Sequence, residues 1–179
     1  MIHGAVVFYP SPIGRLRLVA DDAGRLCGLS LNSGHDGEAL RPIQDNAIAR
    51  ETLGQAVHYL DAYFAGCALG PAPPIRLGGT AFQRRVWRAL MTVDFGQTIS
   101  YAELARRIGS PSAARAVGLA NAANPLLLVV PCHRVIASNG GLAGFAAGVR
   151  AKRWLLDHER RFAGLFSPVN AAPGPASIT

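Results

Sequence analysis

The first third of the chain alternates between short apolar runs and turn-forming residues. Residues 5–9, 15–20 and 26–31 are rich in β-branched and other apolar side chains, and segments containing proline, glycine or aspartate separate them. Apolar runs of this length, bounded by such turns, are typical of β-strands joined in hairpins. We therefore predict a three-stranded antiparallel meander.

A helical pattern follows the polar segment 33–46, which we interpret as a loop. Within residues 47–65 the apolar positions recur every three or four residues, and Gly66 follows the last of them. This spacing predicts a helix that ends at a glycine C-cap. The proline-rich segment 71–74 is typical of a linker, so we predict a first domain over residues 1–74.

Two capping boxes open the second half of the chain. Thr80 and Gln83 have the spacing of a capping box and predict a helix that runs to about residue 91. Ser100 and Glu103 repeat that spacing and predict a short helix that ends at Gly109. Both helices belong to a predicted second domain over residues 75–163.

Ser110 and Pro111 predict the start of a third helix, as N-cap and first helical residue, which continues to about residue 123. Two short helices joined by a tight turn are typical of a helix-turn-helix, although the pattern alone also fits any αα-hairpin. A last helix is predicted over residues 149–161, and the tail 164–179 is predicted to be flexible. The fold class is therefore mixed α/β (α+β).

Charge is distributed unevenly along the 179 residues, whose net charge is +7. Residues 1–70 hold five arginines against seven acids (net −2), whereas residues 71–179 hold thirteen basic residues against four acids (net +9). A basic second half indicates a polyanion-binding surface confined to that half. Charge alone does not decide the matter, because many basic proteins bind no nucleic acid.

Cysteine spacing and hydropathy indicate the compartment in which the chain is expected to act. Three widely spaced cysteines do not form a disulfide framework, and we expect a reducing cytoplasm. No apolar run approaches the roughly 18 residues that span a bilayer, and the first twenty residues lack the apolar core of a signal peptide. Cys27 and Cys67 have histidines nearby in sequence but no metal-binding spacing, so we expect neither a metal nor a cofactor.

Candidate chemistry centres on the hexapeptide 131–136, Pro-Cys-His-Arg-Val-Ile, which follows an apolar run and precedes a glycine-rich segment. Cys132 lies between a buried run and a loop, beside His133 and Arg134. Neighbouring positive charge and partial exposure favour the nucleophilic thiolate. The alternative is an inert buried cysteine with a chance histidine neighbour.

A second candidate is Arg115, which stands alone among small residues in the predicted third helix. Small side chains let a helix approach a groove closely, and a single arginine on such a surface can reach into a duplex. A surface salt bridge is the plainer alternative. The small residues are Ala113, Ala114, Ala116, Gly118 and Ala120.

Together these motifs resemble the O6-alkylguanine-DNA alkyltransferases, also called methylated-DNA–protein-cysteine methyltransferases. The resemblance covers residues 79–159 with the family's spacing, and the first half resembles the family's N-terminal domain less distinctively. It implies an RNase H-like N-terminal domain and a winged helix-turn-helix-type C-terminal domain. The matching segments are 79–83, 86–87, 100–101, 104–105, 115–118, 124–125, 131–136, 144, 152 and 155–159.

The resemblance implies a suicide reaction in which Cys132 takes the alkyl group from guanine O6, with O4-methylthymine a further candidate substrate. By position, His133 removes the thiol proton through a bound water, Glu159 orients the imidazole, and Asn124 braces the turn that carries the cysteine. This is the nucleophile–base–orienter arrangement with a water inserted. It needs no cofactor.

The resemblance further implies a partner, double-stranded DNA carrying O6-alkylguanine, whose damaged nucleotide is flipped out of the stack. Arg115 would fill the gap and Tyr101 would press on the phosphate. The protein is expected to be a monomer, with cooperative binding left open. The implied DNA contacts are Ser100, Tyr101, Ala114, Arg115, Gly118, Asn121 and Arg134, and the implied substrate pocket is Tyr101, Val135, Phe145, Ala146 and Lys152.

Three positions depart from the family pattern. Phe145 replaces a common tyrosine, Ala146 stands where the family often has a hydroxyl, and Asp94 replaces a common proline. Two other readings remain. A DNA-binding module without transfer is disfavoured by the presence of Cys132, because such alkyltransferase-like proteins replace that cysteine. A cysteine hydrolase would need an oxyanion hole, of which the sequence gives no sign.

Overall fold

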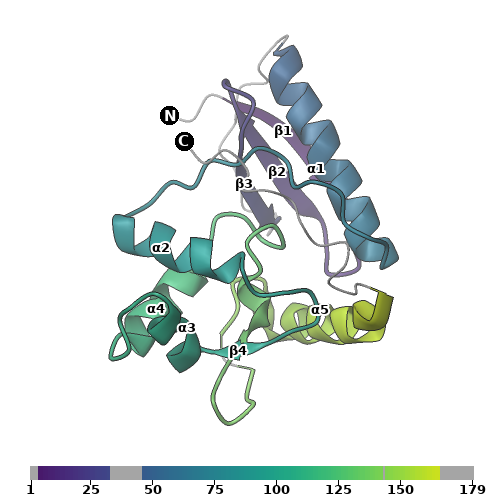
Figure 1. The fold of residues 1–179 in the computed structure, drawn as a ribbon. Coiled ribbons are helices and arrows are strands. Elements are labelled where there is room, and N and C mark those ends of the chain that lie inside the picture. Colours follow the sequence, from purple (N-terminus) through teal and green to yellow (C-terminus); the bar gives the residue numbers. More distant parts are fainter. Residues whose placement is uncertain (1–3, 33–45, 143, 166–179) are drawn as a thin grey trace. The chain divides into compact units, whose positions relative to one another are not determined.

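The computed structural model describes residues 4–32, 46–142 and 144–165. The chain forms two compact units, and the division falls between Leu77 and Gly78 (Figure 1). The sequence placed this boundary after residue 74. The three residues that follow stay with the first unit, because Ile75 forms a β-bridge with Leu26.

The first unit is the predicted meander with a helix across one face (Figure 1). Strands β1 (Gly4–Tyr9), β2 (Leu16–Asp21) and β3 (Leu26–Leu31) pair antiparallel in sequence order. Leu18 of β2 lies opposite Leu29 of β3, and both side chains are buried in the core of this unit. The prediction of three strands is confirmed.

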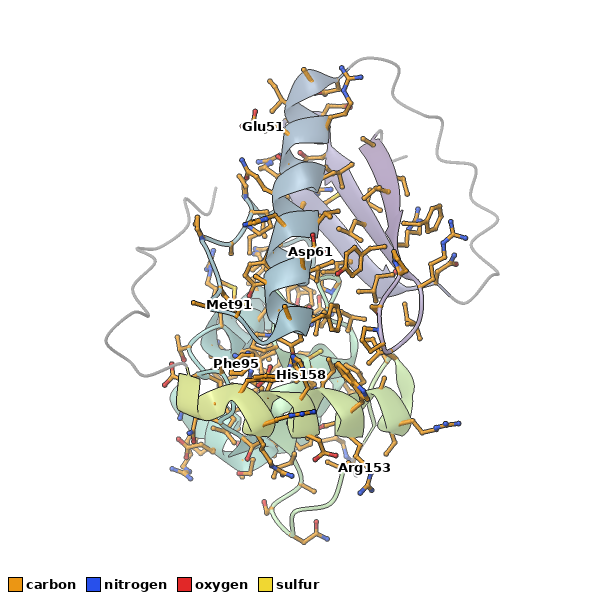
Figure 2. All side chains as sticks on the ribbon, turned by 90° about the vertical axis from the view of Figure 1, so that its right-hand side faces the viewer. Glu51, Asp61, Met91, Phe95, Arg153 and His158 are labelled. Atoms are coloured by element: carbon orange, nitrogen blue, oxygen red, sulfur yellow. The ribbon has the colours of Figure 1, made fainter. Side chains whose placement is uncertain are left out.

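Helix α1 (Ala47–Ala65) packs on β1 and β2 and has the predicted ends. The Asn46 side chain accepts a hydrogen bond from the Ala49 N–H, and Gly66 adopts the left-handed conformation (φ 66°) that stops the helix. The Tyr9 hydroxyl donates to Asp61, labelled on α1 in Figure 2, at 2.8 Å and ties β1 to this helix. Of the predicted loop 33–46, only Asn46 is among the described residues.

The second unit is mainly helical (Figure 1). Its hydrophobic core includes Val86, Leu104, Val117 and Leu155, all fully buried. Its elements are α2 (Ala81–Leu90), β4 (Ile99–Ser100), α3 (Tyr101–Arg107), α4 (Ala114–Ala122), β5 (Val135–Ile136), α5 (Gly148–Phe162) and two 3-10 turns (Cys132–Arg134 and Ala163–Leu165).

Helices α3 and α4 pack on each other and on α2, with the short parallel pair β4–β5 beside them. This is the arrangement expected of a winged helix-turn-helix. The capping box at Thr80 is complete, because Thr80 accepts from the Gln83 N–H and Gln83 accepts from the Thr80 N–H. Ser100 caps α3 by accepting from the Glu103 N–H at 3.0 Å.

The predicted start of the third helix is wrong. Helix α4 begins at Ala114, three residues after Pro111, and no side chain caps it. The Ser110 N–H instead bonds to the Ala105 carbonyl, and Gly109, at φ 69°, bonds to the Arg106 carbonyl. These two bonds close α3 in a Schellman motif. The Ala113 N–H then bonds to the Ser110 carbonyl at 2.9 Å, so residues 110–113 form a separate turn and α4 starts after it.

Helix α5 begins at Gly148, one residue before its predicted start, and presents a buried face that repeats every four residues. Ala151, Leu155 and Glu159 follow one another on this face, which places the carboxylate in the interior of the unit. The predicted tail lies almost wholly outside the described residues. Within the described ranges, no helix combines the length and the apolarity needed to cross a membrane.

Candidate active site

A tight turn held by Asn124 presents the candidate nucleophile. The Asn124 side-chain N–H donates to the Val130 carbonyl at 2.7 Å, and its oxygen accepts from the Leu126 N–H at 2.9 Å. Between these two contacts Leu128 adopts φ 70°, a left-handed conformation that costs a branched residue on the order of 1–3 kcal/mol. One amide therefore fixes both ends of a strained turn just before Cys132.

Cys132 is buried, with 1% of its surface exposed. Burial raises the pKa of its thiol to about 11, although the hydrogen bond from Asn124 and the charge of Lys152 act in the opposite direction. The Asn124 Nδ2 lies 2.9 Å from the Cys132 Sγ. The sequence-based expectation of a partly exposed thiolate is therefore wrong: at rest this site holds a protonated, enclosed thiol.

His133 and Glu159 form a fully buried pair, with His133 Nε2 and Glu159 Oε1 2.8 Å apart. Burial lowers the pKa of His133 and outweighs the opposing effect of Glu159, so the imidazole is neutral near pH 7. Burial opposes the ionisation of Glu159, but the hydrogen bond from His133 and the charge of Arg134 hold its carboxyl pKa far below the usual range. The pair is a neutral base beside a permanent carboxylate.

Arg134 points into the unit and not toward solvent, with 7% of its surface exposed. Its Nε donates to Glu159 Oε2 at 2.9 Å, its Nη2 to Oε1 at 2.9 Å, and its Nη1 to the Val93 carbonyl. This fork-like contact occupies both carboxylate oxygens. The burial does not fit the DNA contact expected for Arg134, because the guanidinium is already engaged in the interior.

Lys152 is also fully buried, and its Nζ donates to the Val135 carbonyl at 2.6 Å. Burial lowers the pKa of Lys152, while its charge favours ionisation of Cys132. Val135 is itself buried, in β5 opposite Ile99. Both residues were expected to line the substrate pocket; both are buried, and neither is among the residues that line the pocket between α3 and α4.

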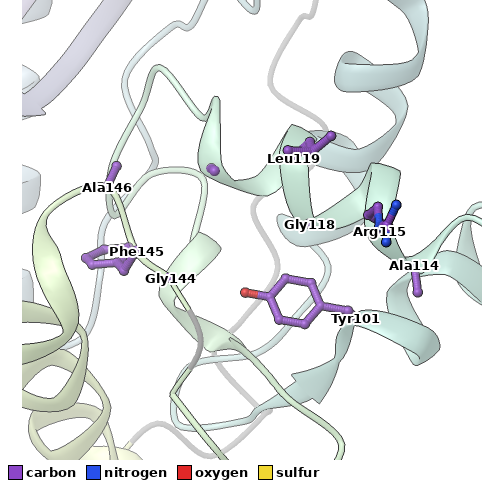
Figure 3. Close-up of a pocket in the computed structure, with 9 residues that line it drawn as sticks. Tyr101, Ala114, Arg115, Gly118, Leu119, Gly144, Phe145 and Ala146 are labelled. Carbon is purple, nitrogen blue, oxygen red and sulfur yellow. The ribbon is translucent and has the colours of Figure 1, made fainter.

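A pocket of about 600 Å³ opens between α3, α4 and the loop that precedes α5 (Figure 3). Six of the predicted residues line it, from both the DNA-contact and the substrate-pocket sets, and Leu119, Ala122 and Gly144 complete the lining. The six are Tyr101, Ala114, Arg115, Gly118, Phe145 and Ala146.

Two aromatic rings connect this pocket to the buried pair. Phe145 is buried and lies edge-on to His133, with ring centroids 6.4 Å apart at 76°. Tyr101 is half-buried; burial raises the pKa of its hydroxyl, and the Cys132 sulfur adds to the effect. Gly118 of α4 faces the Tyr101 ring, and a Cβ added there would lie at an ordinary van der Waals distance of 3.8 Å from that ring. The pocket therefore adjoins the thiol and the imidazole.

Two other predicted DNA contacts have structural partners. Ser100 caps α3, and Asn121, 2% exposed, donates to the Cys132 carbonyl at 3.2 Å. Asn121 therefore supports the cysteine turn from α4, and its burial does not fit a contact with DNA. Among the described residues, no group of three His, Cys, Asp or Glu side chains is placed to hold a metal ion.

Sequence reasoning missed Gly96, whose N–H donates to Glu159 Oε2 at 2.9 Å. Gly96 adopts φ 76°, and a Cβ there would lie 2.6 Å from the Cβ of Ala163. A glycine two residues after Asp94 was the only available signal, and it indicated a turn without naming its partner. Leu119 was also missed, because its position in a helix of small residues does not reveal that it is exposed.

Comparison with known proteins gives two family matches that together cover both units. Residues 81–161 match the model described as 6-O-methylguanine DNA methyltransferase, DNA binding domain, and residues 6–68 match 6-O-methylguanine DNA methyltransferase, ribonuclease-like domain. The second description agrees with the RNase H-like fold expected for the first unit.

Individual relatives agree with these matches. A methylated-DNA–protein-cysteine methyltransferase of Mycobacterium leprae is 52% identical over 108 residues, which span 60% of this chain and 66% of that protein. One from Salmonella typhimurium is 44% identical over 156 residues, 83% of this chain and 91% of that protein. The crystal structure of Mycobacterium tuberculosis OGT in complex with DNA superposes with a TM-score of 0.76 at 42% identity, covering 87% of this chain and 92% of that one.

Proposed function

The chain belongs to the methylated-DNA–protein-cysteine methyltransferase family, and on that premise we propose that it repairs O6-alkylguanine in DNA by moving the alkyl group to Cys132. The observation that carries the proposal is a buried thiol, Cys132, next in the chain to the buried His133–Glu159 pair. These groups adjoin a pocket lined by Tyr101 and Phe145. Matches to the mycobacterial relatives span about two thirds of their length, 66% and 64% for the first two.

The protonation states of Cys132, His133 and Glu159 define the first step. A thiol with a pKa of about 11 is not a nucleophile at neutral pH, so a base must remove its proton. His133 is the neutral base, and it accepts the proton through one water at Nδ1, because Nε2 is engaged with Glu159. Glu159 stays ionised throughout and stabilises the imidazolium that forms.

The transfer itself forms one bond and breaks another. The Cys132 sulfur attacks the alkyl carbon, the new S–C bond forms, and the electron pair of the C–O6 bond stays with guanine. Guanine then takes a proton, so that the proton lost by the thiol is balanced. Because a thioether does not return the alkyl group under these conditions, each protein molecule acts once.

DNA is the proposed partner, bound through α3 and α4. A target base within a duplex cannot reach the pocket, so the nucleotide must rotate out of the stack. Arg115 is exposed at the pocket and is the side chain proposed to occupy the vacated space, with Tyr101 turning the phosphate. We further propose a monomer acting in the cytoplasm, consistent with three free cysteines.

The stoichiometry of labelled methyl transfer tests this proposal. With excess DNA carrying O6-[methyl-labelled] guanine, wild-type protein should accept one label per molecule and then stop. Cys132→Ala should accept none while keeping its far-UV circular dichroism. Continued turnover would support a hydrolase, and tight binding without label would support a damage-binding module.

A further inference from the structure

Leu119 is a large apolar side chain that is exposed to solvent at the edge of the candidate pocket. It is 70% exposed, more than Ile48 (60%), Val149 (44%) or Phe8 (41%), the other large exposed apolar side chains among the described residues. It stands on α4 at the rim of the pocket (Figure 3). The mechanism of transfer proposed above makes no use of it.

Leu119 shares one face of α4 with Arg115. The two are four residues apart, so their side chains project from neighbouring turns on the same side of the helix. Gly118 and Ala122, which line the same pocket, are too small to shield them. The pocket-facing surface of α4 is therefore nearly flat except for one cationic and one apolar projection.

The helix pair that carries Leu119 has a net positive charge. Arg115 lines the same pocket as Leu119. Arg106 and Arg107, in the last turn of α3, both pair with Glu103 in its first turn, so these three charges sum to +1. An exposed apolar side chain on such a helix pair fits a ligand that is anionic outside and apolar inside, which describes a duplex with stacked bases.

We infer that Leu119 is an apolar wedge that enters the duplex beside the flipped nucleotide and packs against a base left exposed there. The inference rests on the proposed function. Four helical residues advance about 6 Å along the axis, and base pairs are stacked about 3.4 Å apart, so Leu119 reaches within two base steps of Arg115. Apolar side chains inserted at such steps unstack them and hold the distorted duplex.

Leu119 is thus a positioning residue. It acts on the duplex and touches no reacting atom, and it makes no phosphate contact. Its loss should weaken duplex binding without changing the slope of affinity against salt, because that slope counts neutralised phosphates. A free modified base has no stack to open, so its reaction with Cys132 should depend on Leu119 far less than duplex binding does.

The test compares wild-type protein with Leu119→Ala, Leu119→Gln and Leu119→Met. Each is measured for affinity to a duplex carrying O6-methylguanine, for fluorescence of 2-aminopurine placed one or two steps from the lesion, and for alkylation of Cys132 by free O6-methylguanine base. Ile48→Ala, a truncation of a side chain that is 60% exposed in the first unit, is the matched control.

We expect Leu119→Ala and Leu119→Gln to weaken duplex affinity about tenfold and to lose most of the fluorescence rise. Leu119→Met and Ile48→Ala should behave as wild type, and in Leu119→Ala and Leu119→Gln the free-base reaction should fall much less than the duplex affinity does. All should melt at the wild-type temperature, since the side chain is exposed.

Wild-type affinity and fluorescence in Leu119→Ala would overturn the inference, as would wild-type duplex affinity in Leu119→Gln. Free-base alkylation that slows in Leu119→Ala by as much as the duplex affinity falls would assign Leu119 to the pocket wall alone and also overturn it. If wild-type protein unstacks the duplex but never alkylates Cys132 with either substrate, the proposed function fails while the wedge stands.

Discussion

Glu159 is the residue on which the buried charges of the site converge. Its two oxygens accept from the Gly96 N–H, from the His133 ring and from the Arg134 guanidinium. A carboxylate with this many donors does not take a proton at physiological pH. Its proposed role is to hold and stabilise the imidazole, and Arg134 in turn contacts both oxygens of the carboxylate.

Removing Arg134 should destabilise the fold strongly. Arg134→Ala leaves the Glu159 charge buried with one partner fewer, which costs about 3–5 kcal/mol. Arg160→Ala is the control, because Arg160 pairs with Asp157 at the surface, where such pairs contribute about 0–1 kcal/mol. Urea unfolding measures both. Equal stability of the two variants would contradict the interior role of Arg134.

The resting thiol should resist alkylation at neutral pH. Cys67 is exposed, so iodoacetamide should modify it well before Cys132. Because the raised pKa of about 11 keeps Cys132 protonated, its rate should climb as pH rises toward that value. Peptide mapping by mass spectrometry follows each cysteine separately. Faster modification of Cys132 than of Cys67 near pH 7 would indicate a resting thiolate and remove the need for His133.

At the scale of elements, the site depends on backbone turns as much as on helices. Asn124 holds the turn before Cys132, a Schellman motif closes α3, and Gly96 brings the segment after α2 against α5. The turn at Asn124 and the turn at Gly96 each place a backbone carbonyl or N–H where a side chain of the site needs a partner. The helices supply position, and these turns supply the hydrogen bonds.

Gly96→Ala should cost more than a matched glycine replacement. Gly96 (φ 76°) and Gly109 (φ 69°) both adopt left-handed conformations, for which a side chain costs about 1–2 kcal/mol. Only at Gly96 would the new Cβ also collide, at 2.6 Å from Ala163, whereas Gly109 has nothing within 4 Å. Thermal unfolding of the two variants gives the comparison, and equal losses would show that α5 moves aside freely.

Local patterns explain which parts of the fold the sequence could predict. The three strands, the capping box at Thr80 and the Gly66 C-cap depend on neighbours within a few residues, and the structure has them all. The start of α4 was mispredicted because residues 110–113 form a turn of their own, closed by the Ala113 N–H on the Ser110 carbonyl.

The interior of the site was harder to predict from sequence. Arg134 looked like a DNA contact because its true partner, Glu159, lies 25 positions away in the chain. Burial of Cys132 reversed the expected state of the thiol, since exposure is a property of packing and not of the hexapeptide. The resemblance indicated the candidate reacting residues, whereas the contacts among the buried charges depend on packing between distant segments.

At the scale of the whole molecule, charge separates the two halves of the chain. Residues 71–179 carry thirteen basic residues against four acids, and several of the arginines lie on or beside α3 and α4. Such a distribution attracts a polyanion to the unit that holds the candidate site. Residues 1–70, whose net charge is −2, contribute little to that attraction.

Duplex affinity should therefore fall steeply as salt rises. The logarithm of the binding constant should decrease linearly with the logarithm of salt concentration, because phosphate contacts release counterions. Arg115→Ala should lower the slope by about 1 if its guanidinium contacts a phosphate, and by less if it lies within the stack. Fluorescence anisotropy across a salt series measures the slope. Salt-independent binding would contradict a phosphate-based interface.

The central claim is that Cys132 itself becomes the alkyl acceptor. Its most direct measurement is the intact mass of the protein after incubation with a duplex containing O6-methylguanine, followed by peptide mapping. We predict a gain of one methylene unit on the peptide that carries Cys132, and no gain in Cys132→Ser. An unchanged mass, or a methyl group on Cys27 or Cys67 instead, would contradict the account.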